Sequence, residues 1–406
     1  MGEGPLAGVR VIDLTSVVFG PLCTQTLGDM GADVIKVEPP EGDFLRALGP
    51  MRSPGMGALF MNLNRNKRSL ALDLKRPEAR AALIRLVRDA DVFVHNVRPG
   101  GLKRLGLDWE SLKAEAPRLI HVSLTGFGTS GPYADRPALD DVIQAACGLS
   151  DLAAKMGGPG TPPCDMPTIV ADKTSGLAAV GAIGMALYQR ERTGVGRAVE
   201  VPMLETVTAW TLADHLFGHV FEPPVGPIGY DRALEPDRKP FEAADGHVAL
   251  LPSTAAQWRR CLEALGRSDL AAEPRLSDAA WRTRERPRLR AAIAAETPKR
   301  TVADWVALFA AAEVPCMPVN RLEDLREDPH LKAVGFFREM EHPTEGRVVV
   351  TAPPLRFEGA EGSIRRLAPV VGEHTAELLA EAGLSPAEIE SLAASGACAL
   401  APRAAG

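Results

Sequence analysis

The 406-residue sequence lacks three features that mark large classes of protein. Its six cysteines are scattered and form no C-x-x-C pair, which argues against a structural metal site and against a disulfide-stapled secreted domain. No apolar run reaches the ~18 residues that a membrane-spanning helix needs. The first five residues, MGEGP, contain no basic stretch and no apolar core, so we expect no secretory leader. These absences predict a cytoplasmic protein with reduced thiols and no membrane partner.

An excess of positive charge is also missing, because the formal net charge is -6. Nucleic acid is therefore not expected as a partner. Hydrophobic residues make up 46% of the chain and charged residues 24%, which is typical of a globular protein. A chain of this length exceeds one simple core and predicts two or three domains.

A dinucleotide-binding glycine motif does not follow the first expected strand. The spacing G-x-G-x-x-G does occur at residues 126–131 (GFGTSG), but Pro132 follows at once and no acidic partner lies ~20 residues further on. A nicotinamide cofactor is therefore not expected. These glycines instead predict a close approach of the backbone to a ligand or to another segment.

Short apolar segments and amphipathic segments alternate through the first half of the chain. Branched apolar residues predict buried strands, and stripes of 3.6-residue period predict helices between them. This alternation predicts a doubly wound α/β domain, in which ligands bind beyond the carboxyl ends of the strands. The expected strands are 9–14, 32–38, 69–74, 92–96, 119–124 and 198–201, and the main expected helices are 22–30, 77–88, 172–190 and 203–217.

Composition shifts divide the chain further. We expect a large domain over residues 1–200, a linker over 201–224 and a small domain over 225–325, because proline and glycine become frequent after residue 221. Strand patterns at 347–351 and 367–369 and a helix at 375–382 predict that residues 326–406 return to complete the large domain.

One aspartate stands out at the start of the long helix expected near residue 172. Asp172 lies in the segment ADKTSG (171–176), where a loop gives way to small and apolar residues. It could be an N-cap, since the first backbone N–H groups of a helix lack partners. It could equally be a nucleophilic carboxylate, whose pKa the helix N-terminus would lower. The segment alone leaves both interpretations open.

Landmarks along nearly the whole chain resemble the class III CoA-transferases, the family that includes formyl-CoA and carnitine CoA-transferases and the α-methylacyl-CoA racemases. The matching segments are PLAGVRVID (5–13), GP (20–21), GDMGADVIKVE (28–38), NRNKRS (64–69), NVRPG (96–100), GFG (126–128), GPY (131–133), RTGVG (192–196) and GEHT (372–375).

The resemblance implies a large, discontinuous Rossmann-like CoA-binding domain, a smaller α/β domain and a homodimer of two interlocked rings. It implies transfer of CoA from a donor acyl-CoA to a small carboxylic acid, with coenzyme A as substrate and product and no tightly bound cofactor or metal. Asp172 matches the family's nucleophile, which forms an acyl anhydride and then an aspartyl-CoA thioester. The residues that match CoA contacts are Val18, Phe19, Leu72, Asp73, Lys75, Asn96, Val97, Arg98 and Arg104.

Five positions depart from the family's branches or extend the site. Leu139 stands where the racemases carry a histidine, and leucine cannot act as an acid or base, which favours transfer over racemisation. Val18 replaces a glutamine of the oxalate branch. Asp140 matches an acidic residue of that branch, although a cap or surface acid is the alternative. Arg232 and Arg238 could pair with a free carboxylate of a dicarboxylic acyl group, although loop arginines are usually exposed. A racemase and a non-catalytic CoA-binding paralogue remain alternative functions.

Overall fold

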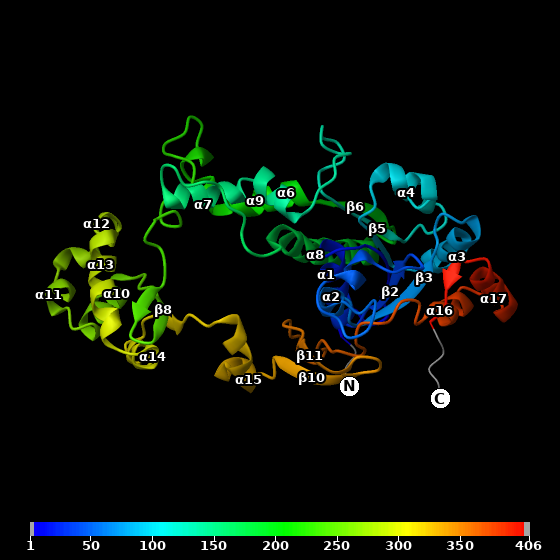
Figure 1. Cartoon of the computed structure of the whole chain (residues 1–406). Coiled ribbons are helices and arrows are strands. Elements are labelled where there is room, and N and C mark those ends of the chain that lie inside the picture. Colours follow the sequence, from blue (N-terminus) through cyan, green and yellow to red (C-terminus); the bar gives the residue numbers. More distant parts are fainter. Residues whose placement is uncertain (1–3, 402–406) are drawn as a thin grey trace. The chain divides into compact units, whose positions relative to one another are not determined.

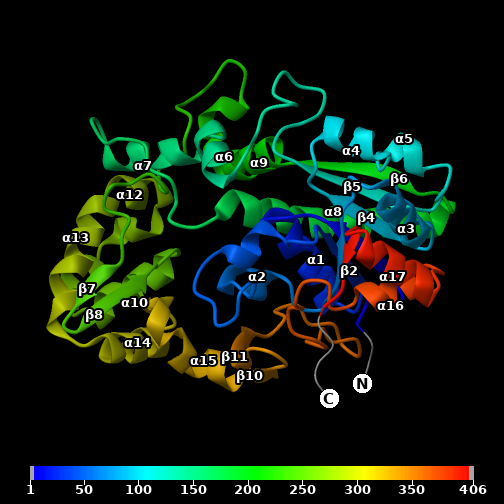
Figure 2. The same ribbon diagram turned by 45° about the vertical axis from the view of Figure 1, so that its right-hand side comes forward.

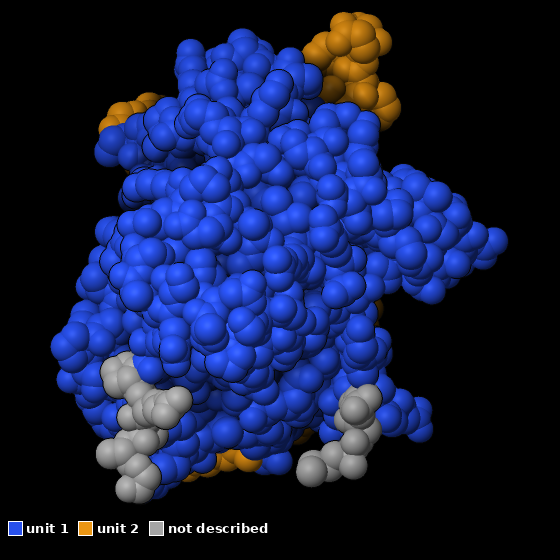
Figure 3. Space-filling model, turned by 90° about the vertical axis from the view of Figure 1, so that its right-hand side faces the viewer, with its two compact units in different colours: residues 1–154, 162–216, 333–406 blue, residues 155–161, 217–332 orange. Residues whose placement is uncertain are grey.

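The computed structural model describes residues 4–401 and divides the chain into two units (Figures 1 and 3). Unit 1 comprises Met1–Ala154, Pro162–Leu216 and Ala333–Gly406, so it is discontinuous in sequence. Unit 2 comprises Lys155–Thr161 and Phe217–Lys332. Residues 1–3, which are part of the stretch that argues against a secretory leader, lie outside the described residues.

Unit 1 is built on a seven-stranded sheet of order β12-β3-β2-β1-β4-β5-β6. All neighbours are parallel except β12, which pairs antiparallel with β3. The sequence order reverses at β1, as in the doubly wound sheets that bind nucleotides. The strands are β1 (Arg10–Leu14), β2 (Asp33–Glu38), β3 (Lys67–Leu72), β4 (Val92–His95), β5 (Ile120–Thr125), β6 (Arg197–Pro202) and β12 (Cys398–Ala399).

Helices cover both faces of this sheet because successive strand side chains point to opposite faces. Val11 packs into one apolar core and its neighbour Ile12 into the other. The first core contains α1 (Phe19–Asp29), α6 (Asp140–Ala146), α7 (Leu149–Gly157), α8 (Val170–Thr193) and α9 (Met203–His215). The second contains α3 (Pro77–Arg88), α4 (Pro99–Leu105), α5 (Trp109–Leu112), α16 (Thr375–Glu381) and α17 (Pro386–Ala394), the last two shown in red in Figure 2.

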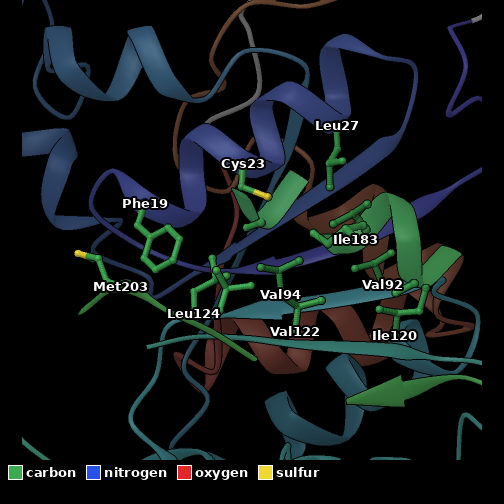
Figure 4. Packing of buried hydrophobic residues seen from close by; sticks show 14 of the residues in the cluster. Phe19, Cys23, Leu27, Val92, Val94, Ile120, Val122, Leu124, Ile183 and Met203 are labelled. Atoms are coloured by element: carbon green, nitrogen blue, oxygen red, sulfur yellow. The ribbon is translucent and has the colours of Figure 1, made fainter. Parts of the chain in front are cut away.

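The first core holds α1 firmly on the sheet. Figure 4 shows Phe19, Cys23 and Leu27, three residues of α1, projecting toward valines and isoleucines of β4 and β5. Phe19 is the first residue of α1 and is 3% exposed. The start of α1 is therefore fixed by packing at the edge where the parallel strands end.

The C-terminal segment is fastened to the large sheet by charge as well as by apolar packing. The guanidinium of Arg68 on β3 lies 2.8 Å from the Glu377 carboxylate and 2.6 Å from that of Glu381, both on α16. Arg10 on β1 lies 3.0 Å from Glu381. Unit 1 also contains α2 (Ala58–Leu63) and the antiparallel pair β10 (Phe337–His342) and β11 (Gly346–Thr351), and α15 (Pro329–Ala333) lies at its border with unit 2.

Unit 2 has its own core around a small antiparallel sheet of order β7-β8-β9. Its largest buried side chains are Trp258, Trp281, Trp305 and Phe309. Two helices begin with capping boxes, at Thr254 and Thr301, which satisfy backbone N–H groups. The elements are β7 (Phe241–Ala243), β8 (Gly246–Leu250), β9 (Cys316–Pro318), α10 (Ala255–Ala264), α11 (Ser268–Ala271), α12 (Ala279–Arg284), α13 (Arg286–Glu296) and α14 (Val302–Ala311).

The fold is α/β, as the alternation of strands and helices predicts, with one wrong strand. Residues 367–369 form no strand. Their carbonyls are satisfied by side chains instead, since Ala368 O accepts from His342 at 2.8 Å and Pro369 O accepts from Arg46 at 3.1 Å. Residues 203–215, within the expected linker, form α9, whose Val207 is fully buried in the first core of unit 1.

All six cysteines are free thiols, and four of them are buried. Within residues 4–401, no helix is long and apolar enough to cross a bilayer.

Candidate active site

The site begins where the strand order reverses, between β1 and β4. The loop after β1 and the loop after β4 are joined there by one side chain. Asn96 accepts a hydrogen bond from the Ser16 N–H at 3.1 Å and donates one to the Ser16 carbonyl at 2.9 Å. Ligands of doubly wound sheets bind in the crevice at this point, and the loops that carry Val18, Phe19, Val97 and Arg98 are therefore at the expected place.

The loop after β1 is strained as well as tethered. Val17 has a φ of 68°, a left-handed conformation that a β-branched residue rarely adopts. A Cβ on Gly20 would lie 2.3 Å from the side chain of Thr15, so only glycine fits there. Such backbone strain is found where surrounding structure forces a fixed geometry, often at functional sites.

Two buried lysines donate hydrogen bonds to backbone carbonyls at the two ends of this loop. Lys36 donates to the Thr15 carbonyl at 3.0 Å, and Lys67 donates to the Pro21 carbonyl at 3.1 Å. Lys36 pairs with Asp43 at 2.7 Å and Lys67 with Asp13 at 3.0 Å, and all four side chains are at most 1% exposed. Burial lowers the pKa of Lys67 to about 8. Fully buried charges are tolerated only when paired in this way, so the network fixes the loop strongly.

Asp172 lies near the start of α8 but is not its N-cap. The cap position is Ile169, and the helix begins at Val170, which makes Asp172 the third helical residue. The N-cap interpretation of Asp172 is therefore wrong, because the N-cap lies three residues earlier. Its side chain is consequently not needed to cap its own helix, and its residue is only 6% exposed.

The environment of Asp172 raises the pKa of its carboxyl to about 7. Burial is the larger cause, and the negative charge of Asp140 is the second, while a backbone hydrogen bond from Phe19 opposes both. The expectation that the helix N-terminus would keep this pKa low is therefore wrong, because desolvation outweighs the helix dipole here. A carboxyl with this pKa is partly ionised near neutral pH, as catalytic groups commonly are.

Gly176, one turn after Asp172 on α8, allows this helix to lie close to the start of α1. A Cβ on Gly176 would lie 2.9 Å from the Phe19 carbonyl oxygen, which is backbone and cannot move aside cheaply. Gly176 is four residues after Asp172 and so lies on the same face of the helix. The pairing of α8 with the start of α1 therefore depends on a residue without a side chain.

Asp140, in the first turn of α6, faces the start of α8. Its Oδ1 accepts a hydrogen bond from the Asp172 N–H at 2.9 Å, and its Oδ2 accepts from Gln144 at 2.6 Å. Gln144 in turn accepts from the Met166 N–H at 2.9 Å. Asp140 is 7% exposed, so it is not a surface acid. Sequence reasoning missed Gln144, which its four-residue spacing from Asp140 could have indicated.

Leu72, which matches a CoA contact, is the last residue of β3, and the other matching residues follow β1, β3 or β4 at one edge of the parallel sheet. Val18, Phe19 and Leu72 are buried, whereas Asn96 and Val97 are half-buried. The three cationic residues are exposed: Lys75 follows β3, Arg98 precedes α4, and Arg104 lies in the last turn of α4. Asp73 accepts a hydrogen bond from the Lys75 N–H at 3.1 Å, which shapes the turn after β3.

The glycine-rich turn after β5 approaches other segments of the chain. A Cβ on Gly126 would lie 2.2 Å from Ala138, and one on Gly128 would lie 2.4 Å from Glu205. The Gly128 N–H donates to Glu205 at 2.9 Å, and the Thr129 N–H donates to Glu200 at 2.7 Å. Both amides therefore donate to carboxylates within the chain.

The remaining predicted residues are Arg232, Arg238 and Leu139. Arg232 and Arg238 belong to unit 2 and line a cavity there. Leu139 precedes α6 and is 65% exposed. Among residues 4–401 no group of three or more histidine, cysteine, aspartate or glutamate side chains is arranged to hold a metal ion.

Comparison with known proteins agrees with this architecture. A family model described as CoA-transferase family III matches residues 6–375. The succinate–glutarate CoA-transferase of Agrobacterium fabrum is 36% identical over 397 residues, covering 93% of this chain and 95% of its own. The succinyl-CoA:mesaconate CoA-transferase of Haloarcula hispanica is 35% identical over 94% of this chain and 97% of its own.

A solved structure shows the same fold over nearly the full length. A CAIB/BAIF family protein from Brucella suis superposes with a TM-score of 0.79 at 34% identity, covering 94% of this chain and all of that one. The order of the strands, the family model and these relatives agree along the chain. The chain therefore belongs to the class III CoA-transferases.

Proposed function

We propose that this enzyme transfers coenzyme A from a donor acyl-CoA to a small carboxylic acid and that Asp172 is its nucleophile. The observation that carries this proposal is a buried carboxyl with a pKa of about 7 at the edge of the sheet where nucleotide ligands bind. Asp140 is the buried acid next to it, but both of its oxygens accept hydrogen bonds from the protein. Asp172 is thus the acid better suited to attack.

The proposed reaction has four balanced steps. The Asp172 carboxylate attacks the thioester carbonyl of the donor, the C–S bond breaks, and CoA leaves as thiolate from a mixed anhydride. The thiolate attacks the aspartyl carbon and releases the donor acid. The acceptor carboxylate then attacks this aspartyl-CoA thioester and releases the thiolate again. The thiolate finally attacks the acceptor carbon of the second anhydride, which forms the new acyl-CoA and restores Asp172.

The contacts that we propose for CoA follow from the crevice at the strand reversal. The exposed cations Lys75, Arg98 and Arg104 would neutralise phosphates, for which guanidinium geometry is well suited. The buried residues Val18, Phe19 and Leu72 would support the loops, with Asp73, Asn96 and Val97 beside them. No metal or tightly bound cofactor takes part in these steps.

Dicarboxylic acids are the substrate class that we propose. The relatives named above are succinate–glutarate and succinyl-CoA:mesaconate CoA-transferases, and each name contains two four- or five-carbon dicarboxylic acids. A dicarboxylic acyl group keeps one free carboxylate after it is attached to CoA. Arg232 and Arg238 are the side chains that we propose to recognise such a group.

We also propose that the enzyme is a homodimer in the cytoplasm. Five large apolar side chains are exposed within twelve residues of unit 2, more than a monomer commonly displays in one segment. They are Phe217, Val220, Phe221, Val225 and Ile228, with exposures from 42% to 72%. Sedimentation of the purified protein would test this directly.

Trapping of the acyl-enzyme tests the proposed function. The protein is incubated with a donor acyl-CoA and then with hydroxylamine or borohydride, and its peptides are mapped by mass spectrometry. We expect a hydroxamate or an alcohol at Asp172 and at no other residue. Replacement Asp172→Asn should remove both the label and transfer, with kcat lowered at least ~10³-fold.

The exposed neighbour of Asp140 offers a matched control. Asp141→Asn should keep both the label and the transfer, because Asp141 lies on the outer side of the same turn. Proton exchange at the α-carbon without any label would instead identify a racemase. Binding of CoA with neither reaction would identify a non-catalytic paralogue, and either result would overturn the proposal.

A further inference from the structure

An arginine-rich cavity lies within unit 2. Its volume is about 230 Å³. The loop after residue 231 and the helices α12 and α13 supply its charged side chains. They are Arg232, Arg238, Arg282, Arg286, Arg290 and a single acid, Glu235.

Three of these arginines are held in place by the protein. Arg282 donates to the Leu276 carbonyl at 2.6 Å, and Arg286 pairs with Glu235, which is 26% exposed. Arg290 donates to the Lys239 carbonyl at 2.8 Å and packs over the ring of Phe241 at 4.5 Å. Positively charged groups fixed in this way form a preorganised wall.

Two arginines of the wall and one nitrogen atom of a third lack partners among the described residues. The side chains of Arg232 and Arg238 make no hydrogen bond or ion pair with any residue that the structure describes. The Nε of Arg290 is buried and likewise has no hydrogen-bond partner among those residues. Burial lowers the pKa of Arg290, and Arg238 and Arg286 lower it further, against Glu235 and Asp237. Unsatisfied donors that repel one another are expected where an anion binds.

Charge and size together restrict the ligand. The lining carries five arginines and one glutamate, an excess of positive charge in a chain whose net charge is -6. One carboxylate would not balance this excess. The cavity is smaller than the ~300–1,000 Å³ typical of sites for drug-sized ligands, so a nucleotide does not fit. Leu250, Trp258 and Ile293 add an apolar wall against which a short methylene chain can pack.

We propose that this cavity binds a small dicarboxylate, with Arg232 and Arg238 as the residues that distinguish it from a monocarboxylate. The proposal rests on the proposed function for the identity of the acid. Arginines bind the anionic oxygens of carboxylates and of phosphates alike. The alternative ligand is therefore a phosphate, either free or on CoA. The cavity thus predicts that Arg232 and Arg238, and not Asp172, determine the selectivity for dicarboxylates over monocarboxylates.

Binding to a protein that cannot react tests the proposal separately from catalysis. The Asp172→Asn protein is titrated calorimetrically with glutarate, succinate, butyrate, inorganic phosphate and CoA. Two ionic contacts in place of one should make glutarate and succinate bind about tenfold or more tightly than butyrate. Arg232→Gln in the same background should weaken glutarate binding about tenfold, with little effect on butyrate.

Arg288→Gln is the matched control, because Arg288 lies on α13 with Arg290, is 61% exposed and lies outside the cavity. It should leave glutarate binding unchanged. Equal binding of glutarate and butyrate, phosphate binding as tight as glutarate binding, or loss of glutarate in the presence of CoA would each overturn the assignment. A failure of the proposed function would be seen in a different experiment, the transfer assay, as activity that survives Asp172→Asn.

Discussion

The Oδ1 of Asp140 accepts a hydrogen bond of 2.9 Å from the backbone N–H of Asp172. This bond satisfies one of the free amides at the start of α8, and it also places a second negative charge beside the Asp172 carboxyl. The same contact therefore stabilises the helix and makes the proposed nucleophile harder to ionise. Two predictions follow from this contact, and two more concern the loops and helices around it.

The first prediction concerns stability. A carboxyl whose pKa rises from 3.8 to about 7 on folding weakens the folded state, fully so above pH 7 and not at all below pH 3.8. Asp172→Asn removes this penalty, and an amide oxygen can still accept from Phe19. We expect the variant to be more stable at pH 8 by an amount on the order of 2–4 kcal/mol, since each pKa unit corresponds to ~1.4 kcal/mol. Urea unfolding from pH 5 to 8 should show the difference growing with pH, and a constant difference would contradict the assignment.

The second prediction concerns the rate of acylation. Asp172 must be ionised to attack, so the first turnover with acyl-CoA should speed up with pH and level off above about 7. Asp140→Asn keeps an acceptor for the Asp172 N–H but removes the neighbouring charge. The midpoint of the profile should then move to lower pH, as stopped-flow or quench measurements can show. Asp141→Asn should leave the midpoint unchanged, and a shift of equal size in both variants would rule out the direct effect of Asp140.

The third prediction concerns the tether between Ser16 and Asn96. Asn96→Ala removes two hydrogen bonds that join the loops after β1 and β4. Hydrogen bonds of this kind contribute about 0.5–1.5 kcal/mol each, so we expect KM for acyl-CoA to rise roughly fivefold to a hundredfold. Steady-state kinetics would measure it. Asn62→Ala, at an exposed side chain, is the control and should keep KM, whereas an unaltered KM in Asn96→Ala would argue against CoA binding at this crevice.

The fourth prediction compares two glycines of α8. Gly176→Ala forces a Cβ within 2.9 Å of the Phe19 carbonyl and should destabilise the protein by about 1–3 kcal/mol while lowering activity. Gly181→Ala meets no atom within 4 Å in the chain and should stabilise the helix by about 0.5–1 kcal/mol with activity retained. Thermal unfolding and transfer assays of both variants test this. Equal behaviour of the two would show that α1 and α8 do not need a close approach.

Sequence patterns predicted the helices and strands whose signal is local. The helix at 77–88 is observed at the same bounds, because a proline in its first turn and a regular apolar stripe define it. The two-residue strand β12 was not predicted, since two residues carry no periodicity and its pairing with β3 spans more than 300 positions. Residues 367–369 were expected to be a strand, and this prediction is wrong. Their carbonyls accept hydrogen bonds from side chains distant in sequence, which the local pattern could not reveal.

The electrostatics of the candidate site could be predicted only in part. The sequence placed Asp172 at a helix start and left Asp140 as a site residue, a cap or a surface acid, but it could not reveal that both are buried beside each other. The backbone hydrogen bond that opposes the rise in the pKa of Asp172 comes from Phe19 of α1, about 150 positions earlier. The helix dipole is a local property, so the sequence could predict it. Desolvation is a property of the assembled fold, so the sequence could not.

The position of β12 has a consequence for how the protein is made. The strand that completes one edge of the large sheet comes from residues 398–399, whereas β1 begins at residue 10. Unit 2, which lies mostly between residues 217 and 332, leaves the ribosome before that strand does. Because the ribosome delivers the chain from its amino end, the smaller unit can acquire its structure during synthesis, while the edge of the larger one stays open until residues 398–399 have been made.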